Sequence, residues 1–308
     1  MDGLNSLWVE KHRPVNLDTY IGNDFIKDKV AIYLESNDVP HLLLHGVAGT
    51  GKTTLAKIIV KNIECDFMYI NASDERGIDT IRHKIKGFAS SVGFKPLKII
   101  ILDESDHLTP DAQASLRNVM ETFSGHSRFI LTCNYVERII DPIQSRCQSF
   151  QVIPPDRKQV AVHLSNILDS ENITYDIQDL GIIVNSGYPD IRRVINAGQR
   201  QSVSGKLVID KQSSILNDYK VKLLDILKDK TKDKKKSFNE IRQLLADSKV
   251  RDYSDAFRLL YDNLDEFANN SKATSILSLA EGQLQDSQVV DKEINFMATM
   301  IKLLGDIK

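Results

Sequence analysis

Cysteine, tryptophan and unbalanced charge are all scarce in this chain of 308 residues. Its three cysteines, Cys65, Cys133 and Cys147, lack metal-ligand spacing and are odd in number, which argues against a zinc site or a disulfide framework. The formal net charge is only -2, so contact with nucleic acid would require a local basic face. No apolar stretch approaches the roughly 18 residues of a membrane span, and the N-terminus lacks the pattern of a secretory signal. These absences favour a reducing, intracellular location.

A phosphate-binding pattern, G-x-x-x-x-G-K-[ST], is matched at every fixed position by residues 46–53. The apolar run 41–45 before it predicts a buried strand, and residues 54–62 after it predict a helix. A glycine-rich loop in that position directs backbone N–H groups at phosphate oxygens, helped by the helix N-terminus. Lys52 would reach the β- and γ-phosphates, and the Thr53 hydroxyl would ligate Mg²⁺. A chance glycine turn is the alternative, which the flanking strand and helix disfavour.

Short β-like runs alternate with helical stretches from about residue 41 to 152, at 41–45, 67–70, 97–102, 128–133 and 148–152. Residues 99–102 and 129–131 are continuously apolar, as in strands covered on both faces. We therefore expect an α/β core with a mainly parallel five-stranded sheet and helices on both faces. Its site should lie at the carboxyl ends of the strands.

Two breaks divide the chain into three expected domains. Pro154-Pro155 ends the alternating pattern, and the composition changes again near Ser204-Gly205. We expect a nucleotide-binding domain at 1–152, a small helical lid without a convincing strand at 153–205, and a helical collar or oligomerisation domain at 206–308. The lysine-rich run 228–236 reads as a solvated loop between helices, with a nucleic-acid contact as the alternative. The collar is predicted from apolar stripes at helical spacing, made by Phe238, Ile241, Leu244, Leu245, Phe257, Leu260, Leu264, Phe267, Met297, Met300, Ile301 and Leu304.

Acidic residues follow the apolar run 99–102, about fifty residues after the phosphate loop. Asp103 would hold the second shell of the metal, and Glu104 would polarise an attacking water. Asp106 fits the acidic preference of a helix start, and Thr109-Pro110 fits a cap followed by a first-turn proline. Asn134 ends the next strand and would touch the γ-phosphate or its water, although an isolated asparagine more often starts a turn.

These motifs together resemble a known family. Residues 46–53, 103–106, Asn134 and Ser145-Arg146-Cys147 resemble the AAA+ ATPases, and more narrowly the small subunits of replication factor C-type sliding-clamp loaders, including phage clamp-loader large subunits. Residues 8–14 resemble the family's N-terminal signature, with His12 in place of the usual tyrosine, and 71–79 and 133–135 match further blocks. Strong motifs cover 8–152, and the C-terminal third matches only in length and helical character.

The resemblance implies an ATP and Mg²⁺ site. Arg146 would act in trans as an arginine finger, and Arg192 would sense the γ-phosphate, although two extra residues after Gly187 leave Arg193 as an alternative. The implied catalytic residues are Glu104, Lys52, Asn134, Arg146 and Arg192, and the metal residues are Thr53 and Asp103. The implied nucleotide-binding residues are Val9, Arg13, Ile21, Gly46, Val47, Ala48, Gly49, Thr50, Gly51, Lys52, Thr53, Thr54, Asn134 and Arg192.

A DNA face and a clamp contact are also implied. Residues 79–86 predict a helix start with Arg82 and Lys86 four apart on one face, which suits phosphate contact. The charges alone favour a solvated face, whereas the resemblance implies DNA binding by Arg76, Thr80, Arg82 and Lys86. It also implies clamp binding by Val92 and Phe94.

The function that the resemblance implies is that of an ATPase subunit in a pentameric clamp loader, acting in the cytoplasm or nucleoid of a prokaryotic or phage-infected cell, or in a nucleus. ATP binding would open or hold the sliding clamp and grip the backbone of primer–template DNA, and hydrolysis, stimulated by DNA and clamp, would release the closed clamp. An AAA+ branch-migration or initiator-type motor is the alternative, expected to carry a C-terminal winged helix that 207–308 does not suggest. A structural ring member with a dead site is disfavoured by the full set of site residues.

Overall fold

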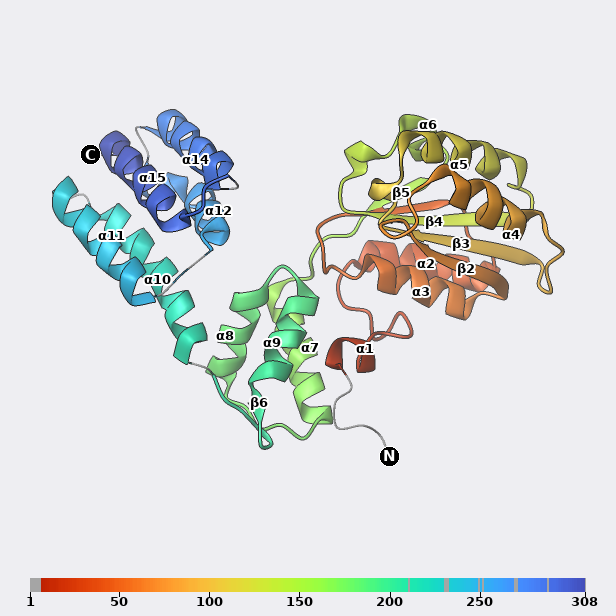
Figure 1. The fold of residues 1–308 in the computed structure, drawn as a ribbon. Coiled ribbons are helices and arrows are strands. Elements are labelled where there is room, and N and C mark those ends of the chain that lie inside the picture. The colour runs from red at the N-terminus through yellow and green to blue at the C-terminus, as the bar shows by residue number, and fades with distance from the viewer. Residues whose placement is uncertain are drawn as a thin grey trace. The chain divides into compact units, whose positions relative to one another are not determined.

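The computed structural model describes residues 7–209, 211–229, 233–248, 250, 252–268, 271–286 and 288–307. A five-stranded sheet forms the centre of its N-terminal part (Figure 1). The strand order is β2-β3-β4-β1-β5, and every neighbouring pair is parallel. The predicted sheet is therefore confirmed. The strands are β1 (Leu42–His45), β2 (Cys65–Asn71), β3 (Leu97–Asp103), β4 (Ser127–Cys133) and β5 (Gln148–Gln151).

Helices cover both faces of this sheet, because successive side chains of a strand point to opposite sides. Leu42, Leu44 and Ile101 pack in one core with residues of α2 (Asp24–Ser36) and α3 (Lys52–Asn62). Leu43 and Ile100 pack in a second core with residues of the helices on the other face. The elements on that side are η1 (Thr80–Ile85), α4 (Lys86–Ser90), η2 (Ser105–His107), α5 (Pro110–Thr122), η3 (Val136–Arg138) and α6 (Asp141–Gln144). Figure 1 shows α2 and α3 on one side of the sheet and α5 and α6 on the other.

Three helices follow the sheet, α7 (Arg157–Ser170), α8 (Ile177–Gly187) and α9 (Ile191–Gln201), and the short α1 (Trp8–Lys11) contacts α9. The expectation of no strand here was wrong at its end, since β6 (Ser202–Val203) pairs antiparallel with β7 (Lys206–Leu207). Ser204 and Gly205 have φ of 51° and 76°. Two consecutive left-handed residues make the tight turn that suits a hairpin, so the predicted break at Ser204-Gly205 is its turn.

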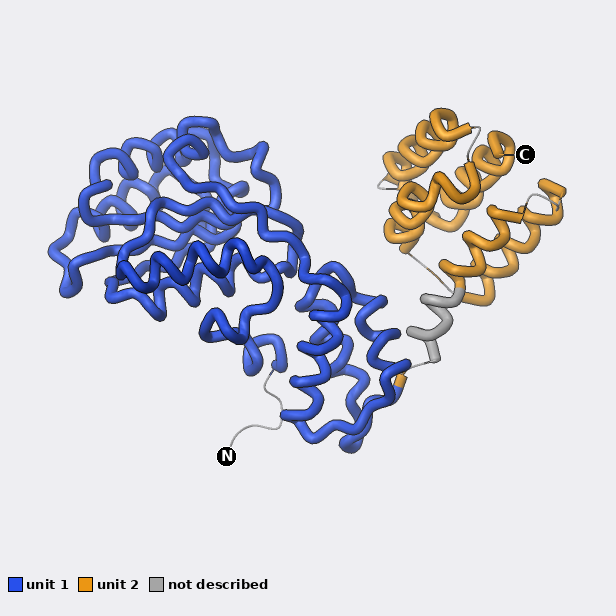
Figure 2. The backbone as a smooth tube through the Cα atoms, turned by 180° about the vertical axis from the view of Figure 1, so that it is seen from behind, with its two compact units in different colours: residues 1–208 blue, residues 209–308 orange. Residues whose placement is uncertain are grey.

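The second compact unit, residues 209–308, is helical in the part that the structure describes (Figure 2). Phe296 lies at its centre, stacked on Tyr253 at 4.7 Å and edge-on to Phe257 at 5.2 Å between ring centroids. The predicted stripes are buried or partly buried except Ile301, which is 57% exposed because it lies one residue, about 100°, beyond the inward-facing Met300. Its helices are α10 (Lys211–Lys228), α11 (Lys234–Ser248), α12 (Ser254–Asp262), α13 (Leu264–Phe267), α14 (Lys272–Asp286) and α15 (Lys292–Ile307).

The lysine-rich run 228–236 begins at the last residue of α10 and extends into α11. Lys228 pairs with Glu266 at 2.6 Å, and Lys234 Nζ donates to the carbonyl of Gly305 at 3.1 Å. Lys230–Lys232, at the centre of the predicted loop, lie outside the described residues. None of the helices described here is both long and apolar enough to cross a membrane.

Candidate nucleotide site

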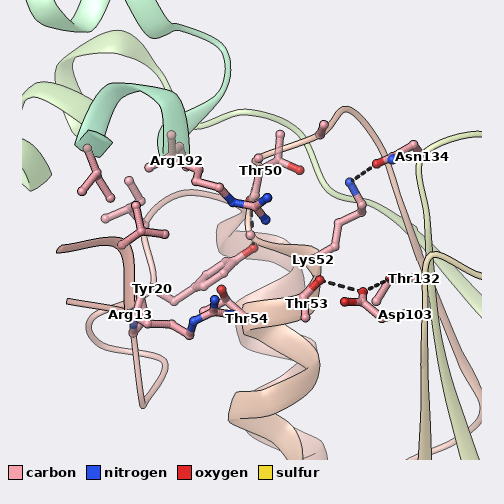
Figure 3. Close-up of a pocket in the computed structure, with 18 of the residues that line it drawn as sticks. Arg13, Tyr20, Thr50, Lys52, Thr53, Thr54, Asp103, Thr132, Asn134 and Arg192 are labelled. Carbon is pink, nitrogen blue, oxygen red and sulfur yellow. Dashed lines mark hydrogen bonds between the residues drawn. The ribbon is translucent and has the colours of Figure 1, made fainter. Parts of the chain in front are cut away.

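A pocket lies beside the carboxyl ends of the parallel strands, between the phosphate loop, the N-terminal segment and α9 (Figure 3). Most of the residues predicted to hold a nucleotide line it. The predicted residues Gly46 and Val47 do not. The lining residues are Val9, His12, Arg13, Pro14, Tyr20, Ile21, Ala48, Gly49, Thr50, Gly51, Lys52, Thr53, Thr54, Asp103, Glu104, Thr132, Cys133, Asn134, His163, Ile191, Arg192 and Ile195.

The backbone of the phosphate loop requires glycine, as Gly46 and Gly51 show. Gly46 has φ of 143°, and a Cβ there would lie 2.4 Å from the carbonyl oxygen of Val152. Gly51 has φ of 96° and directly precedes α3. The loop therefore ends at a helix N-terminus whose first N–H groups have no intrahelical acceptor, which is the arrangement that binds phosphate oxygens.

Lys52 is only 8% exposed and is held by three acceptors. Its Nζ donates to the carbonyls of Gly46 and Val47 and to Asn134 Oδ1, each at 2.8 Å. Gly46 and Val47 thus contribute to the pocket indirectly, by holding the Lys52 ammonium. Asn134, which follows the end of β4, contacts the same ammonium, as Figure 3 shows. Burial lowers the pKa of the Lys52 ammonium, and a phosphate in the pocket would oppose that effect.

The Asp103 carboxylate is surrounded by hydroxyl donors. Thr53 Oγ1 donates to its Oδ1 at 2.7 Å, Thr132 Oγ1 donates to the same oxygen, and Tyr69 donates to Oδ2 at 2.7 Å. A threonine hydroxyl beside a carboxylate fits Mg²⁺, which prefers oxygen ligands and is usually held with substrate phosphates. Among the described residues no group of three or more His, Cys, Asp or Glu side chains is placed to hold a metal ion.

Glu104 lines the pocket and has left-handed backbone, with φ of 55°. Its backbone N–H donates to Thr132 Oγ1 at 3.1 Å, so one threonine positions both acidic residues. Asp106 is buried in η2, and its Oδ2 accepts from the backbone N–H groups of Asn134 and Tyr135 at 3.3 and 3.2 Å. The next helix begins as predicted, since Thr109 Oγ1 accepts from the backbone N–H of Ala112.

The predicted base neighbours Val9, Arg13 and Ile21 line the pocket, and the sequence reasoning missed Tyr20 and His163 among others. The Tyr20 ring is buried against Gly51, where a Cβ would come within 3.0 Å of it. Tyr20 could have been found from the sequence, because it is an aromatic residue directly before the predicted base neighbour Ile21. No local signal marked His163, whose pKa is lowered mainly by burial.

The N-terminal segment is bound to the helices that follow the sheet. Trp8 donates its backbone N–H to Gln199 Oε1 at 3.0 Å. His12 Nε2 and Lys11 Nζ both contact Glu171 Oε1, at 2.5 and 2.7 Å. The substitution noted at His12 thus provides a polar partner for Glu171 while His12 also lines the pocket.

Arg192 lines the pocket from the first turn of α9 (Figure 3), whereas Arg193 is not among the lining residues. Asp190 caps this helix by accepting from the backbone N–H of Arg193 at 3.0 Å. The N–H of Ile191 donates to the carbonyl of Gly49 at 3.2 Å, so the helix start contacts the phosphate loop directly.

Other predicted site residues lie outside this pocket. Arg146 contacts Glu121 and the carbonyl of Pro142. Val92 and Phe94 are fully exposed, at 97% and 101%, in the loop after α4. The four predicted DNA-binding residues lie on or just before η1 and α4, with Arg76, Arg82 and Lys86 exposed and Thr80 half-buried.

Residues 42–155 match the model of the ATPase family associated with various cellular activities (AAA). Sequence identity to individual proteins gives a narrower family than this model does. The chain is 44% identical over 212 residues to the replication factor C small subunit of Halobacterium salinarum, covering 67% of this chain and 66% of that protein. It is 39% identical over 217 residues to the same subunit of Sulfolobus acidocaldarius, covering 68% and 67%. The chain therefore belongs to the replication factor C small-subunit family.

The match spans about 66% of the length of the first of these relatives. Among solved structures, the Holliday junction branch migration motor RuvB of Thermotoga maritima has a similar fold, with a TM-score of 0.56. It is 16% identical, and the similarity covers 93% of this chain and 90% of that one. At that identity the likeness concerns the fold.

Proposed function

We propose that this chain is an ATP-hydrolysing subunit of a DNA sliding-clamp loader. One observation carries the proposal: Lys52 with Asn134, and Thr53 with Asp103, converge on one pocket at the phosphate loop. These four groups are of the kinds that bind a triphosphate and its metal and that orient an attacking water. The family assignment supports a role in DNA replication, and therefore inside the cell.

In this proposal the backbone N–H groups of the loop and the Lys52 ammonium bind the phosphates. Thr53 and Asp103 hold Mg²⁺, which supplies charge neutralisation at the phosphate oxygens when bound. Glu104 takes the proton of the attacking water, and Asn134 orients that water. Arg192, rather than Arg193, is the sensor of the γ-phosphate, because it is the one that lines the pocket.

The site is completed by a neighbouring subunit. Arg146 does not line its own chain's pocket, and its guanidinium contacts Glu121 and the carbonyl of Pro142. We assign it to the pocket of the next subunit in a pentamer, where it stabilises charge on the transferring phosphoryl group. The division into domains at 1–152, 153–205 and 206–308, the last forming the oligomeric collar, belongs to the same proposal.

Two surfaces of the first unit would serve the partners. Arg82 and Lys86 on η1 and α4 would contact the DNA backbone without sequence preference, together with Arg76 and Thr80. The exposed Val92 and Phe94 would dock on the sliding clamp. ATP binding would then hold the clamp open on primer–template DNA, and hydrolysis would release it closed.

The test is ATP hydrolysis by the assembled complex with primed DNA, with the sliding clamp from the same source, with both and with neither. We expect the largest rate with both present. Stimulation by four-way junctions in place of primed DNA and clamp would favour a branch-migration motor. No response to any of these would contradict the loader.

A further inference from the structure

Tyr69 reaches from the edge strand β2 to the acidic centre of the site. In the parallel pairing of β2 with β3, Tyr69 lies opposite Ile101, and Asn71 lies opposite Asp103. Ile101 and Asp103 are two residues apart and therefore point to the same face of the sheet as Tyr69. The ring extends along that face toward the carboxyl end of β3, and its hydroxyl donates to Asp103 Oδ2 at 2.7 Å.

The ring is held in this position from the helix that carries the phosphate loop. Lys57 Nζ of α3 lies 5.1 Å from the centroid of the Tyr69 ring, a cation–π contact. The same helix begins with Lys52 and Thr53. Tyr69 thus contacts both α3, whose N-terminus would bind the phosphates, and β3, which ends at Asp103.

The hydrogen bond from Tyr69 reaches a different oxygen of Asp103 from the bonds of the two threonines. Thr53 and Thr132 both donate to Asp103 Oδ1, whereas Tyr69 donates to Oδ2. Rotation of a carboxylate about its Cβ–Cγ bond is broad, so donors on one oxygen leave the plane of the group loosely fixed. A third donor on the second oxygen fixes that plane.

We propose that Tyr69 is a positioning residue for Asp103, orienting the carboxylate that serves Mg²⁺ in the nucleotide pocket. The inference rests on the proposed nucleotide function. Residues that bond to metal-ligating carboxylates tune metal affinity, and their loss costs about 10–100-fold. The phenol therefore sets how well Asp103 supports the metal-dependent part of nucleotide binding.

The experiment is Tyr69→Phe, which removes the hydroxyl and keeps the ring beside Lys57. Affinity for a fluorescent ADP analogue is measured in EDTA and across a Mg²⁺ titration, with the melting temperature recorded in parallel. We expect the Mg²⁺ concentration for half-maximal effect to rise about 10-fold, with affinity in EDTA unchanged. Tyr33→Phe is the matched control, since it removes a phenol that donates to Gln148 Oε1 at the opposite edge of the sheet.

The other outcomes contradict the inference in distinguishable ways. If the wild type binds the analogue with Mg²⁺-enhanced affinity and Tyr69→Phe shows the same Mg²⁺ dependence, the positioning role is wrong and the nucleotide function stands. If Tyr69→Phe loses affinity equally in EDTA and Mg²⁺ and melts earlier, Tyr69 is a packing residue. If the wild type itself binds no nucleotide, both proposals fail.

Discussion

The Lys52 ammonium lies 2.8 Å from the amide oxygen of Asn134, which joins the phosphate loop to the end of β4. β1, which leads into the loop, is hydrogen-bonded to β4 along its length, so the loop before Lys52 and the residue Asn134 both follow neighbouring strands of the sheet. The ammonium is therefore held between three oxygen acceptors. A γ-phosphate would meet a cation already in position.

Removing this cation should slow hydrolysis strongly. In Lys52→Ala we expect the turnover rate to fall by about 10²–10³, the usual effect of deleting one preorganised donor to the reacting centre, and nucleotide affinity to fall with it. The rate is measured by phosphate release and the affinity with a fluorescent ATP analogue. Lys61→Ala, at an exposed position near the end of the same helix, is the control. Normal turnover in Lys52→Ala would contradict the proposed site.

Arg146→Ala should separate binding from turnover. We expect hydrolysis to fall by about 10³ or more and ATP affinity to stay close to that of the wild type, because Arg146 does not line the pocket of its own chain. The control is Arg258→Ala, which removes an exposed arginine paired with Asp262 in α12. Mixing Arg146→Ala with Lys52→Ala chains should restore some activity where an intact site meets an intact arginine. Collapse of affinity with a surviving rate would contradict the action in trans.

Thr132→Val tests the threonine that links the two acidic residues. The variant keeps the shape of the side chain, but it leaves the backbone N–H of Glu104 without its acceptor and removes one donor from Asp103. We expect a loss of about 1–3 kcal/mol in the free energy of unfolding, measured with urea, and a lower turnover rate. Thr122→Val is the control, since that hydroxyl contacts only an exposed helix carbonyl. Equal stability of the two variants would argue against the link.

Acid should weaken the sheet through His41. Burial, helped by the nearby Arg128 charge, lowers the pKa of His41 to about 4, and its Nδ1 accepts from the backbone N–H of Phe129 at 3.1 Å. Between pH 6.5 and 4 the unfolded chain binds the proton that the folded chain refuses, so stability falls as pH falls through this window. We expect His41 to contribute about 2–3 kcal/mol to the loss between pH 7 and 4.

The measurement is urea unfolding at several pH values for the wild type and for His41→Gln, which keeps an acceptor but cannot titrate. The variant should show a shallower loss of stability toward acid. His83→Gln, at an exposed position on η1, should retain the slope of the wild type. Parallel profiles for His41→Gln and the wild type would show that this histidine does not govern the acid sensitivity.

The sheet and the phosphate loop were predictable because their signals are local. Residues 99–102 are an unbroken apolar run, and the buried strand β3 around them follows from that run. The loop at 46–53 carries its function in glycine spacing, and Thr109 with Pro110 marks the start of α5 within two residues. In each case the physical cause lies within one short segment, so the sequence displays it.

The remainder of the site depends on contacts between distant segments. Tyr69 reaches Asp103 only through the register of β2 against β3, and His163 reaches the pocket only through the packing of α7. The β6–β7 hairpin is too short to show a strand pattern. Ile301 was predicted to belong to a buried stripe but is exposed, because helical spacing does not fix which edge of a stripe faces water.

The direct bond from the N–H of Ile191 to the carbonyl of Gly49 ties the loop to the base of α9. Asp190 closes the same junction, because a Cβ on Gly49 would lie within 1.9 Å of its Oδ1. Any displacement of the loop would therefore either break this junction or move the first turn of α9, and Arg192 with it. The phosphate loop and the helices that follow the sheet are thus mechanically coupled at this one point.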